Sequence, residues 1–151
     1  MSKTEQFETN LTVLANLPPA SGSLDAVFGA HHPTFKSQKV FFRTTQFDQV
    51  EISAVDNDRH WVFNFDKSIT PNTYLIGDQA IKRIWYVQEN PNQIYTPARI
   101  IGKIQIIEID LAKGILKAHF DFSIWRESQG QDSIADAKGT IDVWDLNRTQ
   151  L

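Results

Sequence analysis

The alternation of apolar and polar residues is strongest in the second half of the chain, between residues 115 and 125. There, apolar Ala118, Phe120, Phe122 and Ile124 alternate with Lys117, His119, Asp121 and Ser123. A period of two places successive side chains on opposite faces of an extended strand. This stretch therefore predicts a strand with one buried face and one wetter face.

The preceding residues predict the other arm of a long β-hairpin. Residues 100–109 are rich in Ile, whose branched Cβ suits a pleated surface. Asp110 to Gly114 supplies turn chemistry, with Gly114 free to adopt the positive φ that closes a turn with a bulge. In this arm Ile104 and Ile106 share one parity, whereas Ile107 and Ile109 share the other. Either both faces are covered there, or a β-bulge shifts the register.

Further strands are predicted on both sides of this hairpin. They cover residues 39–45, 49–55, 59–65, 73–76, 80–88, 94–97 and 137–146. Turn signals separate them at short, fairly regular intervals, and few windows have helical periodicity. The pattern predicts an all-β, mainly antiparallel fold: a single-domain β-sandwich or flattened barrel of about eight or nine strands.

The N-terminal part follows a different pattern. Ser2 and Glu5 have capping-box spacing, and Phe7, Leu11, Leu14 and Leu17 recur near the helical period, which predicts a short helix over Ser2–Asn16. The alternative is a strand over Leu11–Leu17. Residues 20–29 are interpreted as an irregular connection. We therefore expect one domain over 1–151, in which residues 1–37 cover an antiparallel β core of residues 38–146.

Composition excludes several classes of function. The 151 residues include no Cys, which rules out disulfides, thiolate catalysis and Cys-type zinc sites. The net charge of −3 gives no electrostatic reason to expect nucleic acid. The sequence has no N-terminal basic segment followed by an apolar run, so it shows no signal peptide. No apolar run reaches the ~20 residues that a membrane span needs. The sequence therefore predicts a cytoplasmic protein, with non-classical export as the alternative.

Several short motifs occur in a characteristic order: V-F-N-F at 62–65, I-T-P-N-T-Y-L-I-G at 69–77, G-K-I-Q-I-I-E-I-D at 102–110, A-H-F-D-F-S at 118–123 and G-T-I-D-V at 139–143. This order, over about Trp61 to Val143, resembles a group of uncharacterised bacterial β-sandwich proteins. Asn72 and Ala118 stand where that group has Gly. Many members look like exported lipoproteins, whose signal this chain lacks. The resemblance implies a fold and no activity.

Three groups of polar residues invite a catalytic or metal-binding interpretation. His119, Asp121 and Ser123 share a strand face, but same-face neighbours lie about 7 Å apart and no nucleophile elbow is present. Histidines 31, 32, 60 and 119 lack H-x-H or H-E-x-x-H spacing. The run 56–58 (Asp-Asn-Asp) could bind calcium but fits a hairpin turn better, and Asp132 with Asp136 also lacks the EF-hand spacing. We therefore predict no catalytic residue, no metal and no cofactor.

The aromatic residues are the best candidates for a binding site. Trp125 and Trp144 do not share parity with the apolar residues of their own strands, so each is expected to face away from that core layer. Together with Trp85 and Tyr86 they form the predicted ligand-binding set, because an exposed Trp is a stacking surface for a sugar ring or a docking point for a protein. Alternatively, the N-terminal part of the chain packs over these rings.

These observations favour a non-catalytic binding or interaction module whose ligand is a glycan or a protein partner. A second interpretation is a carrier that holds a small apolar ligand in an internal cavity. A third is a hydrolase-like enzyme that uses His60 or His119 with an Asp partner. A fourth is a homo-oligomer formed through aromatic faces or edge strands.

Overall fold

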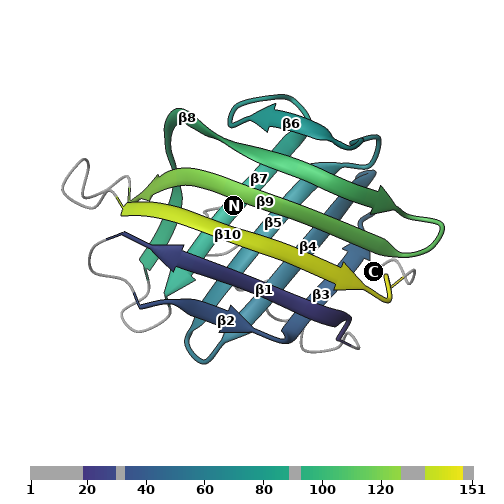
Figure 1. The fold of residues 1–151 in the computed structure, drawn as a ribbon, viewed down its shortest axis with the longest axis horizontal. Coiled ribbons are helices and arrows are strands. Elements are labelled where there is room, and N and C mark those ends of the chain that lie inside the picture. The colour runs from purple at the N-terminus through teal and green to yellow at the C-terminus, as the bar shows by residue number, and fades with distance from the viewer. Residues whose placement is uncertain (1–18, 30–32, 89–92, 127–134, 148–151) are drawn as a thin grey trace.

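The computed structural model describes residues 19–29, 33–88, 93–126 and 135–147, all within strands and their connections (Figure 1). The ten strands are β1 (Ser21–Phe28), β2 (Phe35–Ser37), β3 (Lys39–Thr44), β4 (Gln49–Asp56), β5 (Arg59–Asp66), β6 (Asn72–Leu75), β7 (Ile81–Gln88), β8 (Gln93–Asp110), β9 (Ile115–Trp125) and β10 (Ala135–Trp144). Every pairing between these strands is antiparallel. The predicted all-β, antiparallel class is confirmed.

The strands form one sheet that folds over into two layers. Its order is β2-β1-β10-β9-β8-β7-β5-β4-β3, with β6 paired to β8 beside this path. The first residues of β8 pair with β7, whereas its later residues pair with β9 and β6. This strand therefore carries the sheet from a back layer (β3, β4, β5, β7) to a front layer (β1, β2, β6, β9, β10), and the strands of the two layers cross steeply in Figure 1.

The sheet nearly closes into a barrel where Ala20, just before β1, and Asn147, after β10, meet β3. The backbone N–H of Ala20 donates to the carbonyl of Val40 at 2.8 Å, and that of Asn147 donates to the carbonyl of Phe42 at 2.8 Å. Asn147 also forms a parallel bridge with Arg43. These bonds satisfy backbone groups that an edge strand would otherwise leave unpaired. The fold is thus a nearly closed, barrel-like sheet.

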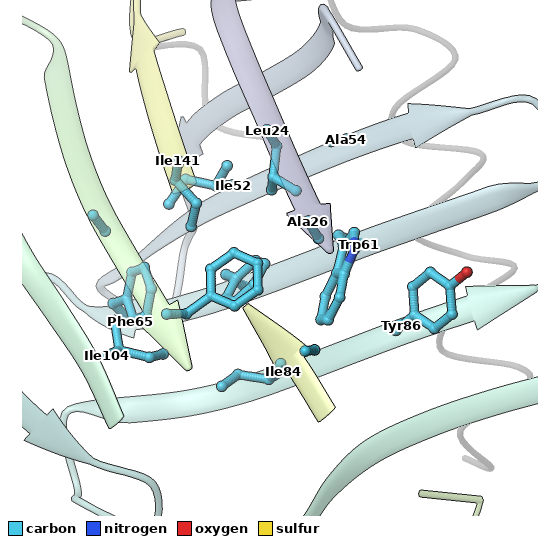
Figure 2. Packing of buried hydrophobic residues seen from close by; sticks show 14 of the residues in the cluster. Leu24, Ala26, Ile52, Ala54, Trp61, Phe65, Ile84, Tyr86, Ile104 and Ile141 are labelled. Atoms are coloured by element: carbon cyan, nitrogen blue, oxygen red, sulfur yellow. The ribbon is translucent and has the colours of Figure 1, made fainter. Parts of the chain in front are cut away.

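Aromatic rings fill the space between the layers. Trp61 lies 5.0 Å from Tyr86 and 5.4 Å from Phe120, between ring centroids, so the rings of both layers interdigitate. Figure 2 shows Trp61 and Tyr86 side by side, with aliphatic residues such as Leu24 and Ile141 around the cluster. Tilted ring contacts of this kind add stabilisation beyond the buried area.

A glycine in β10 makes room for one of these rings. Gly139 lies opposite Phe120 of β9 and Ala26 of β1. A Cβ at position 139 would overlap the Phe120 ring and the carbonyl oxygen of Asp25. Because Gly139 has no side chain, β10 can pair with both β1 and β9 while the Phe120 ring packs across position 139.

We expect Gly139→Ala to lower the free energy of unfolding by about 1–3 kcal/mol, because the added methyl group overpacks a filled interior. Urea denaturation measures the effect. Gly29→Ala is the matched control, since the nearest atom to its Cβ would be the backbone nitrogen of Asp136 at 3.5 Å, an ordinary contact. Equal stability of the two variants would contradict this account of the packing.

The structure confirms the turn of the predicted hairpin and decides between the two alternatives for its first arm. Gly114 has φ of 73°, and the backbone N–H of Lys113 donates to Oδ1 of Asp110 at 3.0 Å, which closes the turn. The register between β8 and β9 shifts between Ile106 and Glu108. A β-bulge therefore explains the slipped alternation, and it leaves Ile107 43% exposed.

Two other predictions about the strands were wrong. Residues 20–29 do not form an irregular connection, because Ser21–Phe28 is β1, with Leu24, Ala26 and Phe28 directed inward. Its small residues, including Gly22 at φ 119°, hid the alternation. Residues 94–97 and 100–109 belong to one strand, β8, which passes Pro97 through a shift of register. The predicted helix over Ser2–Asn16 lies outside the described residues.

Candidate functional site

An open groove of about 390 Å³ crosses the outer surface of the front layer. We call it the front groove. Residues of β1, β2, β9 and β10, together with the connection before β2, line it: Asp25, Ala26, Val27, Thr34, Lys36, His119, Phe120, Lys138, Gly139 and Thr140. Strand register brings these residues together, because Asp25 lies opposite both Lys36 and Thr140, and Thr140 lies opposite His119. Four strands from distant parts of the sequence therefore build one site.

The front groove combines apolar surface with groups that form hydrogen bonds. Val27 is 60% exposed, and Ala26 and Gly139 contribute little or no side chain. Lys36 and Lys138 supply ammonium groups and Asp25 a carboxylate, so both signs of charge are present. Lys138 also contacts Asp121 at 3.7 Å, but both side chains are largely exposed and the pair adds little rigidity. The groove therefore offers polar and apolar contacts to a ligand without a strong field of either sign.

Trp144 and Trp125 lie on the outer face of the front layer but at opposite ends of it. Trp144 is 44% exposed and lies opposite Ile115 at the start of β9, whereas Trp125 ends β9 and is half-buried. The ten positions from 115 to 125 correspond to about 33 Å of strand. The two rings therefore do not form one concave surface. Trp144 is four residues, or about 13 Å, beyond Thr140 of the front groove.

Trp85 and Tyr86 are neighbours on β7 and consequently point to opposite faces. Tyr86 points inward, is fully buried, and lies 4.9 Å from Phe28 between ring centroids. Burial raises the pKa of its hydroxyl, an effect that Arg59 partly opposes. Trp85 lies on the outer side of the back layer, is 4% exposed, and carries the guanidinium of Arg83 4.6 Å above its ring. The structure thus brings neither residue to the front groove.

The outward side of the back layer carries a buried ionic network that the sequence analysis did not identify. Arg43, Glu51, Asn64 and Arg83 lie side by side on four adjacent strands. Nη2 of Arg43 lies 2.9 Å from Oε1 of Glu51, and Nη2 of Arg83 lies 3.2 Å from Oε2. Asn64 donates to the same Oε2 at 3.1 Å. Glu51 therefore joins two cations, and only the register between strands could have revealed the cluster.

His60 lies on the same side, with Val55 and Val87 as its neighbours in register. It is 1% exposed, and burial lowers the pKa of its imidazole to about 4, with a further contribution from Arg83. His119 is exposed and faces Thr140 and Gln105 in the adjacent strands. Register therefore places no carboxylate directly opposite either described histidine. The enzyme interpretation would require a carboxylate beside one of them.

The remaining polar candidates are occupied by local interactions or lie outside the described residues. Asp56 accepts from Arg59 at 2.8 Å and from the side chain of Asn57 at 3.2 Å, and Asn57 has φ of 54° in the predicted turn. Ser123 donates to Asp136 at 2.9 Å. Histidines 31 and 32 and Asp132 fall outside the described ranges. No helix among the described residues is long and apolar enough to cross a membrane.

Comparison of the chain with protein-family models, with curated proteins and with solved structures finds no match. The resemblance to uncharacterised β-sandwich proteins therefore stays a prediction.

Proposed function

We propose that this protein is a non-catalytic binding module that holds a neutral oligosaccharide in the front groove. The single observation that supports this most is the groove itself: about 390 Å³, open to solvent, and lined by apolar and polar groups together. Sugar rings present an apolar face and a rim of hydroxyl groups, so they fit a surface with this mixture. Trp144, on the same face, supplies an exposed ring for stacking at one end.

Individual groove residues have distinct parts in this proposal. The hydroxyl of Thr140 and the imidazole of His119 can donate to and accept from sugar hydroxyls. Asp25 accepts, and Lys36 and Lys138 donate. Val27, at 60% exposure, offers an apolar contact within the groove. The mixed charge favours a neutral ligand over a polyanion.

The other interpretations receive less support. A carrier needs an apolar cavity of a few hundred cubic ångströms, whereas aromatic rings occupy the described interior, with Phe63 and Phe120 only 5.1 Å apart between centroids. An enzyme that uses a His/Asp pair would need a carboxylate within hydrogen-bond reach of the imidazole. A protein partner could use the same outer face, and the experiment below distinguishes it from a glycan.

We expect tryptophan fluorescence to change on titration with at least one of the hexasaccharides derived from cellulose, chitin and xylan. Lys138→Ala should raise the Kd about tenfold or more, which corresponds to about 1.4 kcal/mol for an important contact. Lys103→Ala is the matched control, because Lys103 lies on the same face in the next-but-one strand and does not line the groove. Trp144→Ala should reduce the fluorescence change.

Two results would contradict the proposal. One is the absence of any fluorescence or calorimetric response to all three oligosaccharides at millimolar concentration, which would favour a protein ligand for this face. The other is an equal loss of affinity in Lys138→Ala and Lys103→Ala, which would place the ligand outside the front groove.

A further inference from the structure

The outward side of the back layer is buried although it faces away from the interior. We call this surface the back face. Nine of its residues are less than 9% exposed: Phe41, Arg43, Glu51, Ser53, His60, Val62, Asn64, Trp85 and Val87. Val62, Trp85 and Val87, with half-buried Ile94, form an apolar cluster separate from the main core. A solvated sheet face would leave these side chains exposed, so a further layer lies over them.

No described strand provides that layer. The strands of the front layer lie on the interior side of the back layer, as Figure 1 shows. Ser53, which is fully buried, has Phe41 and Val62 as its cross-strand neighbours within the same face. Contacts between neighbouring side chains of one sheet cannot by themselves exclude solvent from above it. The cover consequently comes from outside the described strands.

We propose that the N-terminal segment of the chain itself, residues 1–18, packs over the back face and forms a third layer of the fold. The described chain begins at the edge of this face: the backbone N–H of Ala20 donates to the carbonyl of Val40 in β3 at 2.8 Å. The N-terminal segment therefore connects directly to the edge strand of the back layer.

The length of the N-terminal segment is sufficient. The four strands β3, β4, β5 and β7 span about 14 Å, at about 4.8 Å between neighbours. A segment of this length extends about 27 Å as a helix and about 60 Å as a strand. Either conformation crosses the back face completely.

The chemistry of the segment also matches. It contains Phe7, Leu11, Val13, Leu14 and Leu17, enough apolar surface to cover Val62, Trp85 and Val87. Its side chains carry two acidic charges and one basic charge, a net −1. The ionic network below has two arginines and one glutamate, a net +1. The two acidic side chains of the segment are opposite in sign to the two arginines of the network, which favours this contact.

The other undescribed stretches fit less well. Residues 30–32 and 127–134 connect strands of the front layer, residues 89–92 join β7 to β8, and residues 148–151 follow Asn147. None of them contains more than one large apolar residue. They therefore cannot bury an apolar cluster that extends over three strands.

The test uses the full chain, which has no Cys, so that one introduced thiol is a unique reporter. Ser53→Cys places the thiol at the centre of the back face, and Val27→Cys places one at an exposed position of the front layer. We expect a maleimide to label Ser53→Cys at least tenfold more slowly than Val27→Cys. Adding Leu11→Asp should remove most of this protection, because Leu11 belongs to the apolar face of the segment as a helix or as a strand.

Thr12→Asp is the matched control, since it adds the same charge on the polar side of the segment in both conformations, and it should leave the labelling rate unchanged. Equal effects of Leu11→Asp and Thr12→Asp, or rapid labelling of Ser53→Cys in the parent chain, would overturn the proposal. Protection that falls on dilution, together with dissociation measured by light scattering, would also overturn it, because the cover would then be a second copy of the chain.

Near-UV circular dichroism shows whether Leu11→Asp unfolds the protein. A cross-linking measurement tests the same contact without that substitution. The double variant Leu11→Cys with Ser53→Cys, or Leu14→Cys with Ser53→Cys, should form an intramolecular disulfide under mild oxidation. Mass spectrometry of the digested, unreduced protein identifies the cross-link. Val27→Cys with Leu11→Cys serves as the negative control. Cross-links that form only between molecules, or that form equally well in this negative control, would overturn the proposal.

Discussion

Replacing Glu51 with alanine is expected to lower the free energy of unfolding by about 3–5 kcal/mol. The Glu51 side chain is 3% exposed and holds Arg43 and Arg83, which are 10% and 26% exposed, at 2.9 and 3.2 Å. Removing the carboxylate leaves two guanidinium groups close together in a site with little water. The loss reflects the cost of uncompensated charge more than the net value of the ion pairs.

The measurement is urea denaturation near neutral pH. Asp121→Ala is the matched control, because Asp121 pairs with Lys138 on the front layer, where the two side chains are 49% and 72% exposed. That variant should lose at most about 1 kcal/mol. Glu51→Gln keeps the shape and an amide oxygen for hydrogen bonding, so it isolates the charge. Similar urea midpoints for Glu51→Ala and Asp121→Ala would contradict this prediction. They would show that the ion pairs of Glu51 stabilise the fold no more than an exposed pair does.

Acidification is expected to destabilise the protein through His60 by about 3 kcal/mol between pH 7 and pH 4. Burial lowers the folded-state pKa of this imidazole to about 4, from 6.5 in the unfolded chain. Between these values the unfolded state binds a proton that the folded state does not. The stability is therefore complete above pH 6.5, falls by about 1.4 kcal/mol per pH unit below it, and levels off near pH 4.

The contribution of His60 is obtained as a difference, since carboxylates also titrate in this range. His60→Gln should have a flatter dependence of unfolding free energy on pH than the parent chain, and the two curves should converge toward pH 4. His119→Gln serves as the control, because His119 is exposed. Parallel curves for the parent chain and His60→Gln from pH 7 to pH 4 would contradict the prediction. The same measurement bears on the back face, because an uncovered His60 would titrate near its ordinary pKa of 6.5.

Local patterns predicted most of the individual strands. Where apolar residues alternate strictly, as in residues 115–125, the buried and exposed faces follow from the backbone geometry of any strand. Turn residues such as Asn57 and Gly114 were equally informative, because only a few residue types adopt positive φ without strain. The prediction failed at β1, where Ser, Gly and Asp conceal an alternation carried by Leu24, Ala26 and Phe28.

The candidate site was much less predictable than the strands. Asp25, Lys36, His119 and Thr140 come from four strands, and no spacing in the sequence relates them. The parity of Trp125 and Trp144 within their strands predicts a face of the sheet but no position along it. Trp125 and Trp144 therefore share a face while lying about 33 Å apart along the strand.

The sequence by itself determined the antiparallel β class, most of the strand positions and several turns, because each of these depends on neighbouring residues. Beyond the hairpin of β8 and β9, the tertiary structure decided which strands are adjacent and in what register. It thereby assembled Glu51 with its two arginines, opened the front groove, and buried Trp85 and His60. The reason is that hydrogen bonds between strands join residues far apart in the chain, and their register follows from packing of the whole sheet around its aromatic core.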